Sequence, residues 1–421
     1  MLLNNAATTP PFHVTLERVR EFLQTYSTFH RGVGLHAGIS FQKVTTAIET
    51  IRRFLGVRDG QSVLFTHNTS SAIGVFARLL HLRTDDIVIT SVIEHTSNHL
   101  PWRFNTSAKA VYVNAFHDGS LDYADLEAKM KQYASRLKVI AITGASSLPG
   151  YIPGLPRIAQ LAHEYHALLF VDAAQLAPHR PINIEEIGVD VLALSAHKLY
   201  APFGLGVLVV PQKLLAQAPL DPGGGSIHMI NEANEVMWAS PDMRRQVGTW
   251  NVIGIVALAA SCQTIMDIGW EQIVAHEKAL TQYSAQALAT VPGLTLYVPP
   301  EKYIAEDRIG TFPFNLNGYH HALLSAILAH EYGIENRAGT ICMHCLVRRW
   351  CGVGDEEQRR VEAEIQKGNL LASYGIVRVS LGLHNTSEDI DILCGALKHI
   401  AQRGPALRYK PVTQEGVFVP L

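Results

Sequence analysis

Seven short apolar runs dominate the first half of the chain and limit the folds that it can adopt. They cover residues 63–65, 87–89, 110–113, 139–142, 168–171, 191–194 and 207–210. Each run is too short for a helix and too continuous for a strand with one wet face, so each predicts a strand buried on both faces. Most are separated by helical segments, such as residues 71–82, 123–134 and 156–165. The pattern predicts an α/β fold with a mainly parallel seven-stranded sheet covered by helices.

The alternation stops after Gly248, which indicates a second domain. Residues 253–283 predict one long helix, or two in series with a break near Gly269. Strands at 295–298, 311–316 and 377–381, with helices at 321–332, 357–366 and 388–402, predict a smaller C-terminal α+β domain. We divide the chain into an N-terminal segment packed on the small domain (1–15), a large domain (16–268), the small domain (269–405) and a turn-rich surface tail (406–421).

Composition excludes several classes of protein. The chain has 421 residues, 48% of them hydrophobic, and 35 basic against 37 acidic residues. Without a basic run, no nucleic-acid partner is expected. The longest apolar run, residues 252–262, is shorter than the ~20 residues that cross a bilayer, and the N-terminus lacks a signal segment. Five cysteines are too few for a disulfide framework. We expect a soluble cytoplasmic protein with no membrane association.

Asp172 and Lys198 each follow a predicted buried strand. Ligands of parallel sheets bind at the carboxyl ends of the strands, so both side chains are expected at one crevice. A lysine there can form an imine, and a nearby aspartate can keep a pyridine nitrogen protonated, as pyridoxal phosphate requires. Taken alone, the aspartate is better explained as a helix cap and the lysine as a solvated surface charge.

The surrounding motifs resemble those of fold-type I pyridoxal phosphate enzymes of the class V aminotransferase group. The branch that they resemble most is that of cysteine desulfurases and selenocysteine lyases, and the likeness covers nearly the whole chain. In chain order the motifs occupy residues 4–10 (NNAATTP), 30–32 (HRG), 94–98 with 101–102 (EHTSN and PW), 172–175 (DAAQ), 195–198 (SAHK), 244–249 (RRQVGT), 337–342 (RAGTIC), and 378–381 with 385–386 (RVSL and NT).

This resemblance implies a cofactor site for pyridoxal 5′-phosphate. Lys198 would hold the cofactor as a Schiff base and shuttle the Cα proton, while Asp172 would pair with the ring nitrogen. Gln175 would bind the ring hydroxyl, and His95 would stack on the ring.

The phosphate group needs backbone N–H groups at a helix start together with hydroxyls, and residues 68–71 (NTSS) provide both directly after a strand. The resemblance assigns this group to Thr69, Ser70, Ser195 and His197. It also implies that Thr249 reaches the phosphate of the opposite subunit, and hence a homodimer, although Gln246 stands where the family has glutamate.

Substrate residues follow from the same resemblance. Arg378 would bind the substrate carboxylate, which suits its planar two-pronged donor. Asn5 and Ser147 are the other expected substrate residues, and Ser147 stands where the family usually has asparagine.

The segment that ends at Cys342 resembles the desulfurase loop in which a cysteine attacks the substrate sulfur. Thr340 and Ile341 replace its two histidines, and an insertion separates Cys342 from Arg378. Cys342 with Cys345 and Cys351 could instead bind zinc or an iron–sulfur cluster, or the three could be inert thiols. Nearby arginines, at 337, 348 and 349, could stabilise a Cys342 thiolate if the loop folds back.

The leading hypothesis is an enzyme that removes sulfur or selenium from an amino acid such as L-cysteine. Alanine would leave, and Cys342 would carry a persulfide for a thiol or an acceptor protein. A first alternative is a class V lyase, epimerase or aminotransferase with another amino-acid substrate. A second is a pyridoxal phosphate-binding homologue that has lost turnover and acts as a partner or scaffold.

Overall fold

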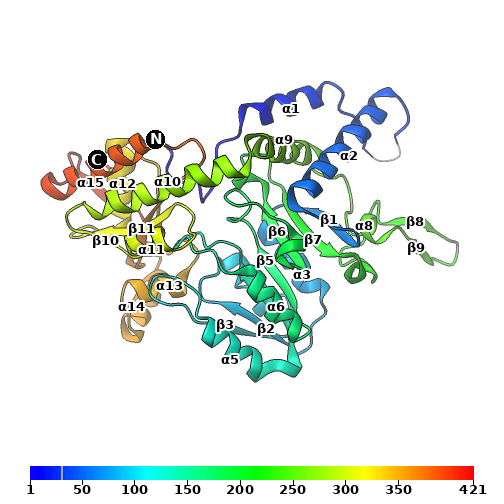
Figure 1. Ribbon diagram of the computed structural model, residues 1–421, viewed down its shortest axis with the longest axis horizontal. Helices are drawn as coiled ribbons and strands as arrows, with labels where there is room; N and C mark the ends of the chain where they lie inside the picture. Colours follow the sequence, from blue (N-terminus) through cyan, green and yellow to red (C-terminus); the bar gives the residue numbers. More distant parts are fainter. Residues whose placement is uncertain (30–31) are drawn as a thin grey trace.

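The computed structural model describes residues 1–29 and 32–421, which form a large and a small domain side by side (Figure 1). His30 and Arg31, the first two residues of one family motif, lie outside the described residues.

The large domain is built on a seven-stranded sheet in the order β1-β7-β6-β5-β4-β2-β3. Its strands are β1 (Gln61–Thr66), β2 (Ile87–Ser91), β3 (Lys109–Val113), β4 (Leu137–Thr143), β5 (Leu168–Asp172), β6 (Val191–Ser195) and β7 (Gly206–Pro211). Only β7 is reversed, because it pairs antiparallel with both β1 and β6. The seven predicted strands and their mainly parallel arrangement are confirmed.

Helices cover both faces of this sheet (Figure 1). Those of the large domain are α1 (His13–Leu23), α2 (Leu35–Leu55), α3 (Thr69–Leu79), α4 (Pro101–Phe104), α5 (Tyr123–Tyr133), α6 (Leu155–Glu164), α7 (Ile184–Ile187), α8 (Pro241–Arg244) and α9 (Val252–Ile268). Val207 and Val209 of β7 pack in one core with α2 and α9, whereas Leu208 and Val210 pack in another with α3. Burial on both faces explains why the strands are apolar without alternation.

The small domain contains a four-stranded antiparallel sheet in the order β10-β11-β13-β12. Its strands are β10 (Leu294–Leu296), β11 (Thr311–Leu316), β12 (Arg337–Gly339) and β13 (Ile376–Ser380). Its helices are α10 (Trp270–Ala289), α11 (Pro300–Ala305), α12 (His321–Tyr332), α13 (His344–Trp350), α14 (Asp355–Gln366) and α15 (Ser387–Arg403). The expected α+β domain is confirmed.

The predicted break in the long helix lies at Gly269, where α9 and α10 meet at 82°. Gly269 has a φ of +90°, a left-handed backbone that glycine adopts without a steric penalty. Within the described residues, no single helix is long and apolar enough to cross a membrane. Helices α9 and α10 have the required length and composition only when they are taken together as this bent pair.

Several elements differ from expectation. The tail, predicted to be turn-rich, contains a hairpin of β14 (Tyr409–Val412) and β15 (Val417–Pro420), and Glu331 of α12 accepts hydrogen bonds from the Ala406 and Leu407 N–H groups. A second hairpin, β8 (Ile227–Ile230) with β9 (Val236–Trp238), projects from the large domain (Figure 1). Strand β12 and helix α13 were also not predicted, because three and seven residues are too few to show a periodicity.

The first residues of the chain pair with the small domain. The Met1 amino group donates to the Gly333 carbonyl at 2.6 Å, and Asn4 forms a bridge with Ser380 of β13. The proposed domain limits, at residues 15, 268 and 405, stay a prediction.

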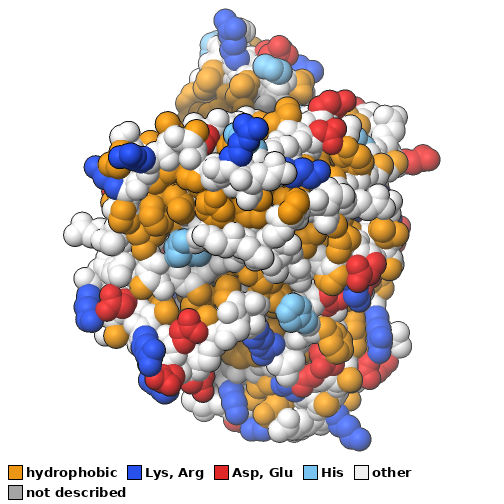
Figure 2. All heavy atoms as spheres, turned by 90° about the vertical axis from the view of Figure 1, so that its left-hand side faces the viewer, with side chains coloured by type: hydrophobic (Ala, Val, Ile, Leu, Met, Phe, Trp, Pro, Cys, Tyr) orange, Lys and Arg blue, Asp and Glu red, His pale blue; other side chains and the backbone are white. Residues whose placement is uncertain are grey.

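The face of the molecule on the small-domain side carries both signs of charge. Figure 2 shows Lys and Arg side chains interspersed with Asp and Glu and with hydrophobic groups. This face therefore presents no broad region of a single charge sign.

A buried charge cluster joins the two domains. Arg180 Nη1 lies 2.8 Å from Glu277 Oε2 of α10, and Arg180 Nη2 lies 2.7 Å from Asp307 Oδ1. His179 Nδ1 lies 2.7 Å from the other Glu277 oxygen. The side chains of His179, Arg180 and Glu277 are each less than 10% exposed. Because buried charges are costly when unpaired, the cluster favours one relative placement of α10 and the loop after β5.

Replacing Arg180 by alanine should therefore destabilise the protein, since Glu277 would lose its cationic partner in a buried site. We expect a loss of about 3–5 kcal/mol in the free energy of unfolding, measured by urea denaturation. Arg360→Ala is the control, because Arg360 pairs with Glu356 on the exposed face of α14. That change should cost less than about 1 kcal/mol. Equal losses in the two variants would contradict the role given to the cluster.

Candidate active site

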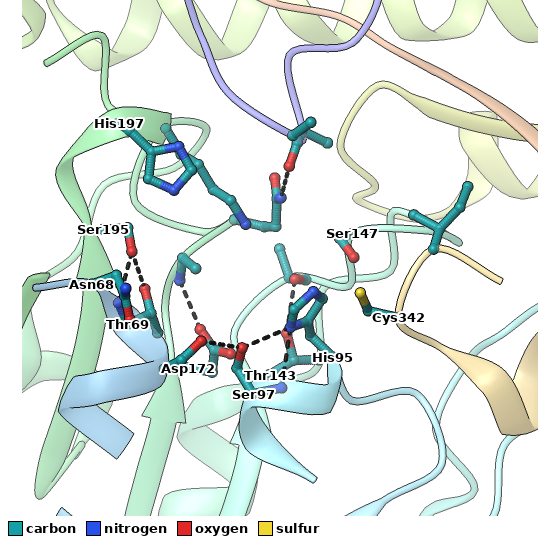
Figure 3. A pocket seen from close by; sticks show the side chains of 18 of the residues that line it. Asn68, Thr69, His95, Ser97, Thr143, Ser147, Asp172, Ser195, His197 and Cys342 are labelled. Atoms are coloured by element: carbon teal, nitrogen blue, oxygen red, sulfur yellow. Dashed lines mark hydrogen bonds between the residues drawn. The ribbon is translucent and has the colours of Figure 1, made fainter. Parts of the chain in front are cut away.

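A cavity of about 350 Å³ lies where the parallel strands of the large sheet end and the small domain begins. It is lined by every predicted site residue except Asn5 and Thr249, namely Thr69, Ser70, His95, Ser147, Asp172, Gln175, Ser195, His197, Lys198, Cys342 and Arg378. Figure 3 shows Asn68, Thr69 and Ser195 at one end of this pocket and Ser147 and Cys342 at the other.

The Thr69 end of the pocket has the features of an anion site. Helix α3 begins here, capped by Asn68, whose Oδ1 accepts from the Ser71 N–H at 2.9 Å. The Thr69 N–H donates to Ser195 Oγ at 2.7 Å, and the Ser70 and Ser97 hydroxyls lie 2.5 Å apart. Backbone N–H groups at a helix start, together with hydroxyls, bind phosphate well. Burial lowers the pKa of His197 to about 4, so its ring is neutral at pH 7.

Asp172 and Gln175 lie at the end of β5 and in the turn after it. Asp172 is 4% exposed, and its Oδ1 accepts from the Ala174 N–H at 3.0 Å. Burial raises the pKa of this carboxyl group above its ordinary value. Gln175 Nε2 donates to the Ala6 carbonyl at 2.6 Å, while its Oε1 is buried without a partner among the described residues. The two side chains thus offer the pocket a carboxylate and a free acceptor.

Lys198 ends the short 3₁₀ turn Ala196–Lys198 that follows β6. Burial lowers the pKa of its amine to about 8, although the charge of Asp172 opposes this shift. A larger fraction of the amine is therefore neutral near pH 7 than for an exposed lysine, and the neutral amine is the nucleophile.

His95 is held in place by its own loop. The Ser97 N–H donates to His95 Nδ1 at 3.1 Å, so the ring proton lies on Nε2. Burial, followed by the positive charge of Lys198, lowers the pKa of His95 to about 4. Its ring is consequently a neutral, flat surface at physiological pH.

The other residues of the 94–102 motif hold this loop in place through buried hydrogen bonds. Glu94 accepts from Ser91 Oγ and from Asn98 Nδ2, and Asn98 Oδ1 accepts from Trp102 Nε1 at 3.0 Å. Glu94 is 2% exposed, and burial raises its pKa to about 8. The sequence identified these residues only as parts of a motif. Their hydrogen bonds show that they stabilise the loop that carries His95.

Arg378 is a buried cation on β13. Its Nη1 donates to the Ser147 carbonyl at 3.0 Å, and its Nη2 donates to Asn4 Oδ1 at 3.1 Å. Its Nε has no partner among the described residues. Burial, and then the charge of Arg337, lowers its pKa to about 9. A buried guanidinium bound only to neutral oxygens has a strong affinity for a carboxylate.

Cys342 lies in the turn between β12 and α13. Ile341 and Cys342 both have left-handed backbones, with φ of +48° and +59°. Such conformations are uncommon in residues other than glycine, and they cluster at functional sites. Figure 3 shows the Cys342 sulfur on the side of the pocket where His95 and Ser147 lie.

Of the three arginines considered for Cys342, only Arg337 lines the pocket. Arg348 pairs with Asp355, and Arg349 donates to Asn114 at 3.2 Å. In the described parts of the chain, no three His, Cys, Asp or Glu side chains are placed to hold a metal ion, so the zinc or iron–sulfur alternative for the three cysteines has no support.

Two predicted site residues lie outside the pocket. Asn5 donates to the Ser380 carbonyl at 3.0 Å and to Asn385 Oδ1 at 3.1 Å, and its neighbour Asn4 is the one that reaches Arg378. Thr249 is exposed on the large domain. Both roles stay predictions, and the geometry of the single chain favours Asn4 over Asn5.

Comparison with known proteins agrees with this site. The family described as Aminotransferase class-V matches residues 1–393. A probable cysteine desulfurase of Halalkalibacterium halodurans is 30% identical over 404 residues, which are 94% of this chain and 92% of that protein. A cysteine desulfurase of Escherichia coli O127:H6 is 29% identical over 411 residues, again 94% of this chain and 92% of that protein.

Solved structures give the same result. The cysteine desulfurase CsdA of Escherichia coli has a TM-score of 0.78 and 27% identity, covering 94% of each chain. The apo cysteine desulfurase of Thermococcus onnurineus NA1 has a TM-score of 0.83 and 25% identity, covering 96% of this chain and 94% of that one. The chain therefore belongs to the class V aminotransferase family of pyridoxal phosphate-dependent enzymes.

Proposed function

We propose that the protein is a pyridoxal phosphate-dependent cysteine desulfurase that converts L-cysteine to alanine and a persulfide on Cys342. The observation that carries the proposal is that Cys342, Lys198 and Arg378 line one pocket. A nucleophilic thiol, a lysine amine and a carboxylate-binding cation are thereby available to the same small molecule. The similarity to cysteine desulfurases over 94% of the chain supports this choice.

The residues present fit pyridoxal phosphate. Lys198 would hold it covalently, Asp172 would face the ring nitrogen, and the unpaired Gln175 Oε1 would accept from the ring hydroxyl. The neutral His95 ring would cover one face, and the start of α3 with Ser195 and His197 would hold the phosphate. When bound, the cofactor supplies an electron sink for negative charge that develops at the substrate Cα.

Arg378 and Lys198 would position the substrate and move its proton. The Arg378 guanidinium, fixed by the Ser147 carbonyl and Asn4, would bind the carboxylate in a two-pronged manner. The Lys198 amine, whose pKa of about 8 lies near physiological pH, is suited to take the Cα proton.

Cys342 would perform the sulfur transfer. Its thiolate attacks the substrate sulfur, and the Cβ–S bond of the substrate breaks. Protonation of that Cβ atom gives the methyl group of alanine. L-Cysteine and the Cys342 thiol thus become alanine and the Cys342 persulfide, with no external oxidant or reductant. A thiol or an acceptor protein then removes the outer sulfur.

We also infer a homodimer, as the Thr249 motif implies. The β8–β9 hairpin exposes four apolar side chains, Met229, Ile230, Val236 and Met237, each between 39% and 55% exposed. Val247, 37% exposed, lies two residues before Thr249. Met229 pairs with Met237 across the hairpin and Ile230 with Val236, so both faces of this projecting element carry exposed apolar groups that a partner chain could cover. A second copy of the chain is the partner that would complete the site through Thr249.

A cytoplasmic location also stays a prediction.

The depressed pKa of Lys198 can be tested through cofactor loading. The apoenzyme should bind pyridoxal phosphate covalently at a rate that rises as the pH passes through about 8, because only the neutral amine attacks and deprotonation occurs above the pKa. Absorbance changes between pH 6 and 10 measure this rate, and peptide mapping after borohydride reduction identifies the modified lysine. A rate that rises only near pH 10.5, or a label on another lysine, would contradict the assignment.

Replacing Cys342 by alanine should abolish formation of both alanine and persulfide from L-cysteine. The variant should still bind the cofactor and show a spectral change with L-cysteine, since Lys198, Asp172 and Arg378 remain. Product analysis by mass spectrometry measures the outcome, and Cys351→Ala is the matched control. Undiminished alanine formation by Cys342→Ala would show that Cys342 is not the group that takes the sulfur, whereas pyruvate or 3-mercaptopyruvate as the product would favour a lyase or an aminotransferase.

Mixed dimers test the shared site. If Thr249 serves the partner's phosphate, a dimer of one Thr249→Ala chain and one Lys198→Ala chain contains one site with both defects and one with neither. Such dimers should recover about half of the wild-type activity, although each single variant is inactive. Zero activity in verified mixed dimers would place both residues in the same site of one chain.

A further inference from the structure

The backbone at Cys342 is fixed on both sides. The Ile341 side chain is 9% exposed and the Met343 side chain 2% exposed, and both belong to the core of the small domain. The Thr96 N–H donates to the Cys342 carbonyl at 3.0 Å, and the Ser146 and Ser147 hydroxyls each contact Met343 Sδ at 3.8 Å. To bring Cys342 to the surface, two buried side chains would have to leave the core. A persulfide formed on Cys342 therefore stays in the pocket wall.

Cys345, three residues further along, is exposed. It lies in the first turn of α13, whose inner face is anchored by the buried side chains of Leu346, Val347 and Trp350. The Trp350 Nε1–H donates to the His117 carbonyl at 2.6 Å, and its ring stacks on Tyr297 at 5.2 Å. Helix α13 thus holds a surface thiol at a fixed place close to the pocket.

Cys345 and Cys351 differ in their surroundings. The pKa of Arg348 is raised, first by its hydrogen bond with Asp355 and to a smaller extent by the negative charge of a Cys345 thiolate. Arg348 follows Cys345 by three residues on α13, so the two side chains lie on the same face of the helix. Cys351 instead donates to the Gly375 carbonyl at 3.7 Å, and burial raises the pKa of its thiol. Of these two cysteines, Cys345 is the one suited to exchange reactions, because the thiolate is the reactive form.

We propose that Cys345 takes the outer sulfur from the Cys342 persulfide and presents it at the protein surface. This inference rests on the proposed desulfurase function. The Cys345 thiolate attacks the outer sulfur, the bond from that sulfur to Cys342 breaks, and a new sulfur–sulfur bond forms at Cys345. Cys342 leaves as a thiolate and takes up the proton that Cys345 gave up, so no oxidant or reductant is needed.

Chain geometry allows this transfer. Three peptide units limit the two Cα atoms to about 11 Å. The left-handed backbone at Cys342 and the helix that starts at His344 shorten the path further. The outer sulfur also extends the reach of Cys342 by about 2 Å. The acceptor that follows would be a thiol that approaches the outer side of α13 without entering the pocket.

The proposal is tested by determining which cysteine carries the persulfide during a single turnover. The holoenzyme is mixed with L-cysteine, alkylated at successive times and cleaved with trypsin. Residues 338–348 form one peptide that holds both cysteines, and fragmentation between Met343 and His344 separates them. We expect the outer sulfur on Cys342 first and on Cys345 later. In Cys345→Ser it should remain on Cys342, with alanine still formed in the first turnover.

Cys351→Ser is the matched control and should reproduce the wild-type time course. A persulfide confined to Cys342 at all times in the wild type would overturn the transfer, as would sulfur on Cys345 in the Cys342→Ala variant. Alanine formation by Cys342→Ala with no persulfide on any cysteine would refute the desulfurase function itself, so the two failures are distinguishable.

Discussion

The parallel strands of the large domain all end at the same edge of a sheet that is buried on both faces. The position of the candidate active site depends on this shared edge. Helices on either face fix the strands, so the turn after each strand begins at a fixed point. Asp172 ends β5, Lys198 follows β6, and the Thr69 start of α3 follows β1. A buried carboxyl group, an amine and a helix start that suits an anion are thus brought to one pocket by residues far apart in the sequence.

The second half of the site comes from the small domain, and Arg378 is its link to the first. Its guanidinium extends from β13 to the Ser147 carbonyl of the large domain and to Asn4 of the N-terminal segment. These partners are neutral, so no anion among them neutralises the buried charge, which suits the carboxylate-binding role that we propose for Arg378. The cluster of His179, Arg180, Glu277 and Asp307 stabilises the same arrangement at a distance from the pocket.

Motif residues that look equivalent in the sequence have different tasks in the fold. His95 lines the pocket, whereas Glu94, Asn98 and Trp102 form a buried hydrogen-bonded chain beneath it. Likewise, Cys342 lines the pocket, while Cys345 is exposed and Cys351 is partly buried. Spacing along the chain does not distinguish these positions, because a difference of one to three residues reverses the direction of a side chain in a turn.

The sequence by itself determined the seven strands, the bend at Gly269, the order of the motifs and the positions of Asp172 and Lys198 at the ends of strands. These depend on local features: apolar runs, glycine, and residue types placed directly after strands. The tertiary structure alone decided that Asn4 rather than Asn5 reaches Arg378, that Arg348 and Arg349 pair with Asp355 and Asn114 and do not line the pocket, and that Ile341 and Met343 anchor the cysteine turn. Each of these contacts depends on how two distant segments pack, and β12 and α13, which set the direction of the cysteine turn, are too short to leave a periodic signal.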